Sequence, residues 1–273
     1  MTDCTLRPRI IPVLLVHNGG LVKTVRFQDP KYVGDPVNAV RIFNEKAADE
    51  LIVLDIDATV RRREPDYELI RNLAAECRMP LCYGGGIKTA EQADRVVNLG
   101  VEKVAVSSEA IENPAALEAI ARRIGSQSVV AVADVKRDRD TGTYQVWTRN
   151  GSKASNRNVV DVVESVQSSG AGEVVVNSIE NDGVMEGYDL ALVRTVRPLV
   201  RVPFTVLGGA GRLDHLEALI RDCGLVGAAA GSLFVFKGAY RAVLISYPRL
   251  ADRGALVVRA HEHRPVETSA VKM

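Results

Sequence analysis

The chain has 273 residues, 47% hydrophobic and 25% charged, a composition typical of a globular protein with a sizeable core. Thirty-five basic and 34 acidic residues give a formal net charge of +1, which argues against a protein that binds nucleic acid or a membrane surface through bulk charge. No run approaches the roughly 20 apolar residues that span a bilayer, and residues 1–8 lack the apolar centre of a signal peptide.

Eight short segments rich in β-branched residues recur along the chain, with helical segments between them. Their nearly continuous apolar character predicts strands covered on both faces, as in a parallel sheet. The predicted strands are Ile10–Val16, Glu50–Ile56, Pro80–Tyr83, Lys103–Ser107, Val129–Asp134, Glu173–Asn177, Pro203–Leu207 and Val226–Ala230. Strict alternation with helices predicts an α/β fold, a (β/α)8 TIM barrel, with an open doubly wound sheet as the alternative.

The segments between the strands carry signals for helix starts. Asp35-Pro36 and Asn113-Pro114 each place a capping side chain before a proline at the first helical position. Thr89 begins a capping box that Gln92 completes. These signals support helices between the predicted strands.

The chain is expected to form one barrel with an insertion and a tail. Residues 137–154 follow the fifth strand as an insertion, and Thr141-Gly142-Thr143 predicts a hairpin tip within it. The barrel is expected to cover residues 1–252. Residues 253–273 lose apolar periodicity, so we expect a polar, flexible C-terminal tail.

The cysteines and histidines form no metal-binding pattern. The four cysteines are far apart and include no C-x-x-C pair. Two of the four histidines, His261 and His263, fall in the polar tail. We therefore expect reduced thiols in a cytoplasmic protein, with neither a metal nor a cofactor.

Glycine clusters recur in the two halves of the chain at the same spacing. Gly84-Gly85-Gly86 has a counterpart in Gly208-Gly209-Ala210, and Ser107-Ser108 has one in Gly231-Ser232. This pattern predicts a twofold internal repeat of half-barrels. Glycines after strands let backbone N–H groups approach an anion, and barrels commonly bind phosphate after strands 7 and 8. We expect a ligand with two phosphates; glycines that serve only tight turns are the alternative.

These residues, in this order, resemble the cyclase (synthase) subunit of imidazole glycerol phosphate synthase, from histidine biosynthesis. The resemblance runs from Arg9 to about Leu250. Its motifs are Arg9-Ile10-Ile11-Pro12, Gly34-Asp35-Pro36, Tyr83-Gly84-Gly85-Gly86-Ile87, Gly125-Ser126-Gln127, Gly170-Ala171-Gly172-Glu173, Asp182-Gly183, Gly187-Tyr188-Asp189 and Gly208-Gly209-Ala210-Gly211. It implies a barrel that binds a bisphosphate on its C-terminal face and takes ammonia through its core from a glutaminase at its N-terminal face.

The resemblance also implies which residues contact the phosphates. The corresponding positions are Gly86, Ser107, Ser108, Asp182, Gly183, Gly209, Gly231 and Ser232. Ser107-Ser108 replaces the family's Asn-Thr pair, and both hydroxyls remain able to bind phosphate. Lys23 matches a mobile lysine of the family.

The implied catalytic pair is incomplete. The family uses two aspartates, at the ends of strands 1 and 5, as acid and base. Strand 5 supplies Asp134, but strand 1 has Leu15 in place of the aspartate. His17 is a poor substitute, because two residues along a strand displace it by about 6.5 Å. Asn177 and Leu207 also depart from the family, which has threonine and serine there.

The N-terminal face, in contrast, keeps the family's charged residues. The family guards its ammonia entrance with an arginine, two glutamates and a lysine at strand starts. Here these are Arg9, Glu50, Lys103 and Glu173. Charged residues that only stabilise this end of the barrel are the alternative.

Three functions remain open from the sequence. The chain resembles divergent relatives associated with surface polysaccharide, notably in Val13-Leu14-Leu15, Val22-Lys23-Thr24-Val25-Arg26-Phe27 and Pro80-Leu81-Cys82-Tyr83-Gly84. This resemblance implies a barrel that passes ammonia from a glutaminase to a separate sugar-amidating (O-antigen) enzyme. The second function is the histidine-pathway cyclase itself, and the third is a non-catalytic activator of the glutaminase. The related isomerase of the pathway also needs paired carboxylates, so Leu15 argues against it. Besides the glutaminase, the expected partners are a phosphorylated small molecule and a sugar amidotransferase, with no nucleic acid and no membrane.

Overall fold

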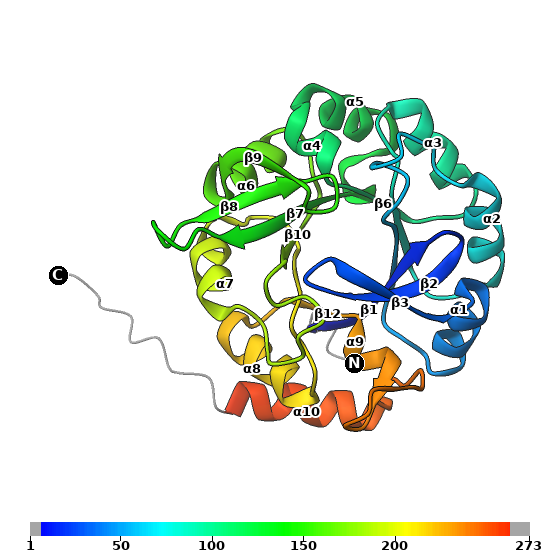
Figure 1. Cartoon of the computed structure of the whole chain (residues 1–273), viewed down its shortest axis with the longest axis vertical. Helices are drawn as coiled ribbons and strands as arrows, with labels where there is room; N and C mark the ends of the chain where they lie inside the picture. Colours follow the sequence, from blue (N-terminus) through cyan, green and yellow to red (C-terminus); the bar gives the residue numbers. More distant parts are fainter. Residues whose placement is uncertain (1–6, 263–273) are drawn as a thin grey trace, which may run out of the picture.

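Eight parallel strands form a closed ring with helices around it, in a computed structural model that describes residues 7–262 (Figure 1). The barrel strands are β1 (Arg9–His17), β4 (Leu51–Asp55), β5 (Leu81–Gly84), β6 (Lys103–Val106), β7 (Val129–Arg137), β10 (Glu173–Ser178), β11 (Phe204–Leu207) and β12 (Gly227–Ala230). Pairing of β1 with β12 and of β7 with β10 closes the ring. The predicted (β/α)8 barrel is therefore confirmed over the open sheet.

Helices cover the outside of the barrel. They are α1 (Pro36–Glu45), α2 (Tyr67–Glu76), α3 (Ala90–Asn98), α4 (Ser108–Glu112), α5 (Pro114–Ile124), α6 (Val159–Ser168), α7 (Leu190–Val196), α8 (Leu213–Cys223), α9 (Ser232–Val235) and α10 (Leu250–Glu262), with 3-10 turns η1 (Ser126–Ser128) and η2 (Arg197–Leu199). The short helices α4 and α9 begin at equivalent serines of the two halves, which supports the predicted repeat. No helix within residues 7–262 has the length and apolar character needed to cross a membrane.

Two of the three predicted helix caps are present. The Asp35 side chain accepts from the Asn38 backbone, and Thr89 forms both bonds of the capping box. Asn113 makes no side-chain cap, although Pro114 does begin α5. Its amide donates instead to Glu109 of α4, at 2.9 Å, because α4 and α5 meet at this residue.

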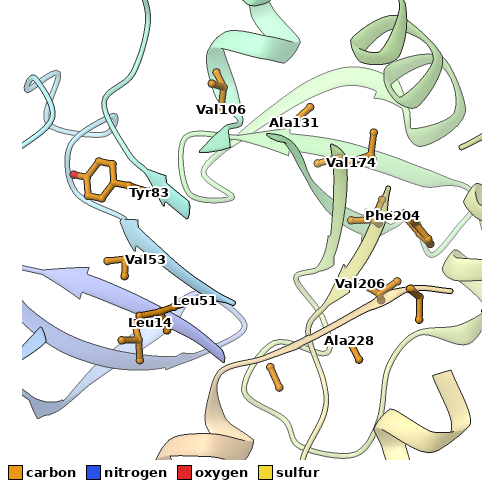
Figure 2. Close-up of a cluster of buried hydrophobic side chains, with 14 of the residues drawn as sticks. Leu14, Leu51, Val53, Tyr83, Val106, Ala131, Val174, Phe204, Val206 and Ala228 are labelled. Carbon is orange, nitrogen blue, oxygen red and sulfur yellow. The ribbon is translucent and has the colours of Figure 1, made fainter. Parts of the chain in front are cut away.

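Two hydrophobic clusters follow from the alternation of side chains along each strand. The larger one lies between the strands and the helices, and Figure 2 shows part of it, from Leu14 and Leu51 around to Phe204 and Ala228. The smaller one fills the barrel interior; its buried members are Ile11, Val13, Ile52, Cys82, Ala105, Val130, Val132, Val175, Leu207 and Ala229. The barrel interior is thus packed with apolar side chains.

Hairpins extend the C-terminal end of the barrel and stand in front of the ring in Figure 1. After β1 come β2 (Gly20–Val25) and β3 (Gln28–Gly34), and after β7 come β8 (Tyr144–Thr148) and β9 (Lys153–Asn158). The second hairpin is the predicted insertion, with Thr141 in its first turn. The first was not predicted, because β3 is polar and largely exposed. A small hairpin of β13 (Phe236–Lys237) and β14 (Ala242–Val243) follows α9.

Residues 253–262, which we expected to belong to a flexible tail, form most of helix α10. Leu256 and Ala260 are fully buried where α10 packs against α8, and the buried Arg253 pairs with Asp49. The buried residues Arg253, Leu256 and Ala260 have helical spacing. Because the first of them is charged, the apolar periodicity of the helix is not visible in the sequence. Residues 263–273 of the expected tail lie outside the described residues.

The packing of α10 predicts how substitutions on its two faces change the free energy of unfolding. Replacing Leu256 with alanine should lower the free energy of unfolding by about 2–5 kcal/mol, because it removes a fully buried side chain. Val258→Ala, on the exposed face of the same helix, should cost less than about 0.5 kcal/mol. Urea denaturation of both variants measures the difference, and equal small effects would show that α10 does not pack.

Candidate functional site at the C-terminal end of the barrel

A cavity of about 320 Å³ opens at the C-terminal ends of the strands. The predicted site residues that line it are Lys23, Gly86, Ser107, Ser108, Asp134, Asp182, Gly231 and Ser232. The three positions that depart from the family, Leu15, Asn177 and Leu207, line it as well. Gly183 and Gly209 are absent from its walls. The cavity therefore collects residues from both halves of the repeat.

The departures from the family share the end of the barrel interior with Asp134. Asp134 pairs in register with Asn177, and Asn177 pairs with Leu207 on the next strand. On the other side, Leu15 pairs with Leu54 and packs against the interior cluster. The floor of the cavity thus has one carboxylate, one amide and apolar side chains at these positions.

Asp134 is buried and hydrogen-bonded on both oxygens. Asn177 donates its amide to one carboxylate oxygen at 3.0 Å, and Ser107 donates its hydroxyl to the other at 3.4 Å. Burial raises the pKa of Asp134 to about 6, although the two hydrogen bonds favour the ionised form. A carboxyl with this pKa can both accept and release a proton near neutral pH.

His17 does not replace the missing carboxylate. Its Nδ1 lies 2.8 Å from Asp57 Oδ1, and the same carboxylate accepts from the Asn18 backbone. His17 is not among the residues that line the cavity. The structure therefore agrees with the expectation that His17 is displaced from the position of an aspartate at residue 15.

Lys23 lies inside the cavity wall. It is 5% exposed, and its ammonium donates to the Val13 carbonyl at 2.5 Å. Burial lowers the pKa of Lys23 to about 8, and Asp182 partly offsets this effect. A side chain at Gly231 would collide with the Lys23 ammonium, so glycine leaves the space that the lysine occupies.

Asp182 and Gly183 hold the β2–β3 hairpin against the barrel. Asp182 accepts from the Thr24 hydroxyl at 2.9 Å, and its carbonyl accepts from the Arg26 backbone at 2.8 Å. Gly183 has a φ of +70°, and a side chain there would collide with the Thr24 carbonyl. In this geometry both residues position the hairpin.

Gly209 also allows two loops to approach closely. It has a φ of +109°, and its carbonyl accepts from the Gly187 backbone at 2.8 Å. A side chain at Gly209 would collide with the Gly187 carbonyl. Its contact is thus with a neighbouring loop, and it does not line the cavity.

Several lining residues were not singled out from the sequence. They are Thr24, Asp55, Arg62, Lys88, Arg149 and Asn150. Asp55 is the most buried of their charged groups, and its carboxylate accepts from the Asp57 and Ala58 backbones. Burial raises the pKa of Asp55. Its position at the end of a strand was the available signal.

Four charges form a closed ring at the opposite, N-terminal end of the barrel. Arg9 pairs with Glu50 and lies 2.7 Å from Glu173, and the Lys103 ammonium lies 2.8 Å from each glutamate. Burial disfavours the charged form of Glu173, but Arg9 and Lys103 outweigh it and hold the pKa of Glu173 at about 2. The four predicted residues therefore form one network of ion pairs.

The charge ring and the cavity lie at opposite ends of the same apolar interior. Arg9, Lys103 and Glu173 are the first residues of their strands, and Glu50 directly precedes β4. The side chains between the two ends belong to the interior cluster, including the buried thiol of Cys82. Within residues 7–262, no group of three or more His, Cys, Asp or Glu side chains is arranged to hold a metal ion.

The raised pKa of Asp134 predicts a pH-dependent stability. Since the folded pKa of about 6 exceeds the ordinary value of 3.8, the carboxyl favours folding at low pH and loses that contribution as the pH rises through 6. Between pH 4.5 and pH 8, Asp134→Asn should gain about 2 kcal/mol relative to the unmodified protein. Denaturation at both pH values tests this, with Asp140→Asn on the exposed hairpin as the baseline. A difference that does not vary with pH would contradict the assigned pKa.

Comparison with known proteins places the chain in a family. The family model described as "Histidine biosynthesis protein" matches residues 9–241. A Leptospira borgpetersenii protein provisionally named imidazole glycerol phosphate synthase subunit HisF is 54% identical over 251 residues, 92% of this chain and 99% of that protein.

Two further relatives differ in their sequence identity to this chain. A Vibrio vulnificus protein, provisionally named imidazole glycerol phosphate synthase subunit hisF3, is 56% identical over 91% of this chain and 95% of its own. The Streptococcus sanguinis imidazole glycerol phosphate synthase subunit HisF is 39% identical over 84% of this chain and 90% of its own. The chain therefore belongs to the histidine biosynthesis protein family, among relatives named as HisF subunits of imidazole glycerol phosphate synthase.

Proposed function

We propose that this chain is the barrel subunit of a glutamine amidotransferase complex. In this proposal a glutaminase docks at the N-terminal end, and ammonia enters past the charge ring into the barrel interior. The ammonia then serves a separate enzyme that amidates a sugar for surface polysaccharide. A phosphorylated small molecule is the proposed ligand of the cavity at the C-terminal end.

The observation that carries the proposal is the contrast between the two ends of the barrel. All four charges of the entrance are present, and each cation pairs with both glutamates. At the opposite end, the two positions where the cyclase reaction uses aspartates hold Leu15 and Asp134. Loss of a general acid or base typically costs about 10²–10⁴-fold in rate. A barrel that keeps the entrance but lacks half of the acid–base pair is better suited to ammonia transfer than to ring closure.

The exposure of the charge ring is consistent with an entrance that opens outward. The Arg9 and Lys103 side chains are 28% and 20% exposed, whereas the Glu50 and Glu173 side chains are each 4% exposed. The cations thus lie between solvent and the buried carboxylates. Each glutamate contacts both cations, so one cation can move aside while the other still pairs with it.

The chain is also more similar to two provisionally named relatives than to a plainly named subunit. The chain is 54% and 56% identical to the provisionally named proteins, against 39% for the plainly named subunit from Streptococcus sanguinis. The sugar-amidating role rests on the resemblance to the divergent relatives. The amidated sugar is the most specific part of the proposal.

Two other functions have specific support. Family membership and the pKa of Asp134 near 6 favour the histidine-pathway cyclase, whereas Leu15 and the engaged His17 oppose it. A non-catalytic activator of the glutaminase would need only the docking face. The complete charge ring at the N-terminal end of the interior is the observation that favours ammonia transfer over activation alone.

The decisive experiment uses the purified complex with its glutaminase. The complex is supplied with glutamine and the histidine-pathway bisphosphate, and both glutamine hydrolysis and formation of imidazole glycerol phosphate are measured. We expect hydrolysis without efficient cyclase turnover. Efficient turnover, or rescue of a histidine auxotroph, would establish the cyclase instead.

The charge ring predicts the effect of a reversal at the entrance. Lys103→Glu places a third carboxylate beside Glu50 and Glu173, so the ring should lose its closed form. Transfer of ¹⁵N from glutamine to the acceptor enzyme should fall about tenfold or more, while the glutaminase remains bound. Arg122→Glu, on the outer surface of α5, provides the control. Unchanged transfer would support activation without conduction.

Restoring the missing carboxylate should give only partial cyclase activity. Leu15→Asp recreates the pair with Asp134, but Asn177 and Leu207 still differ at the same end of the barrel. We expect Leu15→Asp alone to stay at least about tenfold below the triple variant that also carries Asn177→Thr and Leu207→Ser. Cyclase assays on both variants measure the ratio. Full activity from Leu15→Asp alone would show that Asn177 and Leu207 do not limit the cyclase reaction.

A further inference from the structure

The turn between β8 and β9 holds an arginine in a strained conformation beside the cavity. Arg149 and Asn150 have φ values of +54° and +55°, in the left-handed region that non-glycine residues rarely adopt, and Gly151 follows at +69°. Both non-glycine residues line the cavity. Such strain persists only where surrounding contacts impose it, and it is concentrated at functional sites.

Those contacts come from α4. The Arg149 backbone N–H donates to the Ser108 hydroxyl at 2.8 Å, which fixes the turn against the first-half phosphate position. Because Ser108 accepts this bond through its oxygen, its hydroxyl hydrogen remains able to donate to a ligand. The Arg149 guanidinium pairs with Glu112 at 3.1 Å.

Glu112 does not depend on Arg149. Its other oxygen accepts from the Lys153 ammonium and the Thr148 hydroxyl, each at 2.9 Å. Burial alone would raise the pKa of Glu112, but Lys153, Arg149 and Thr148 together lower it to about 2. If Arg149 moved away, the carboxylate would keep two partners, so departure leaves no unpaired charge.

The pair between Arg149 and Glu112 is also weak enough to exchange. The Arg149 side chain is 42% exposed and the Glu112 side chain 28% exposed, and ion pairs this accessible contribute little to stability. A phosphate at Gly86, Ser107 and Ser108 offers the guanidinium a bidentate partner of higher charge.

We propose that Arg149 is a ligand-binding residue that exchanges Glu112 for a phosphate group in the first-half end of the cavity. The ligand class is a small molecule with a phosphate that the Arg149 fork and the Ser107 and Ser108 hydroxyls bind together. This inference rests on the phosphorylated ligand of the proposed function and adds the residue that selects it. Arg149 is absent from the positions that the family resemblance implies.

Trp147 provides a local probe for the test. It is the only tryptophan of the chain, and it lies on β8 two residues before Arg149. Its ring is covered by the Lys136 ammonium at 3.7 Å, and we expect its fluorescence to change when the neighbouring turn rearranges. Inorganic phosphate is titrated at constant ionic strength into the full-length protein, and the midpoint gives the dissociation constant.

The matched variants are Arg149→Met and Lys153→Met. Both remove one cation from Glu112, but only Arg149 lines the cavity. We expect Arg149→Met to raise the dissociation constant about tenfold, and Lys153→Met to change it less than about twofold. Arg149→Lys, which keeps the charge but loses the fork, should fall between the unmodified protein and Arg149→Met.

Each other outcome overturns the inference in a distinguishable way. If phosphate binds and Arg149→Met does not weaken it, Arg149 is not a ligand-binding residue and the proposed ligand class stands. Equal weakening by both methionine variants would show that the arginine acts only through Glu112 and the hairpin. If the unmodified protein binds no phosphate, the phosphorylated ligand fails together with the role of Arg149, whereas the ammonia-transfer proposal is tested separately by the ¹⁵N measurement.

Discussion

The alternation of side chains along eight closed, parallel strands is the constraint on which the rest of the structure depends. In a closed barrel every second residue must point inward, where no solvent is available to it. On β1 this rule places Arg9, Ile11, Val13 and Leu15 in succession along the interior. One strand therefore contributes to the charge ring, the apolar interior and the floor of the cavity, and a shift by one residue would displace all three.

The same constraint explains why the charge ring is closed. A buried carboxylate without a partner is strongly destabilising, because its lost hydration is not replaced. Glu50 and Glu173 each contact both cations, and Thr205 adds a hydrogen bond to Glu173 at 2.6 Å. The charges of the ring are paired with one another, so they need no polar partner among the apolar side chains of the interior cluster. A charge ring of this kind can therefore lie directly against an apolar interior.

The sequence predicted the features that depend on local pattern and missed those that depend on distant contacts. The barrel strands and two of the three caps were predicted from patterns visible in the chain, and eight of the ten residues predicted for the C-terminal end line the cavity. Helix α10 was missed because its buried stripe begins with Arg253, which is acceptable inside only because Asp49 lies opposite. Arg149 was missed because its position follows from Ser108, a contact between segments 41 residues apart.

The leucine at position 15 changes what Asp134 can do. Two carboxylates at one site would push their pKa values apart, which assigns one as acid and the other as base. With Leu15 in place, the pKa of Asp134 is raised by burial, while the Asn177 amide donates to it and favours the ionised form. At these two positions one carboxyl can exchange one proton with a ligand, whereas two could act as an acid and a base. The floor of the cavity therefore keeps one buried carboxyl, held by Asn177 and Ser107, among apolar side chains, an arrangement suited to binding and orienting a ligand.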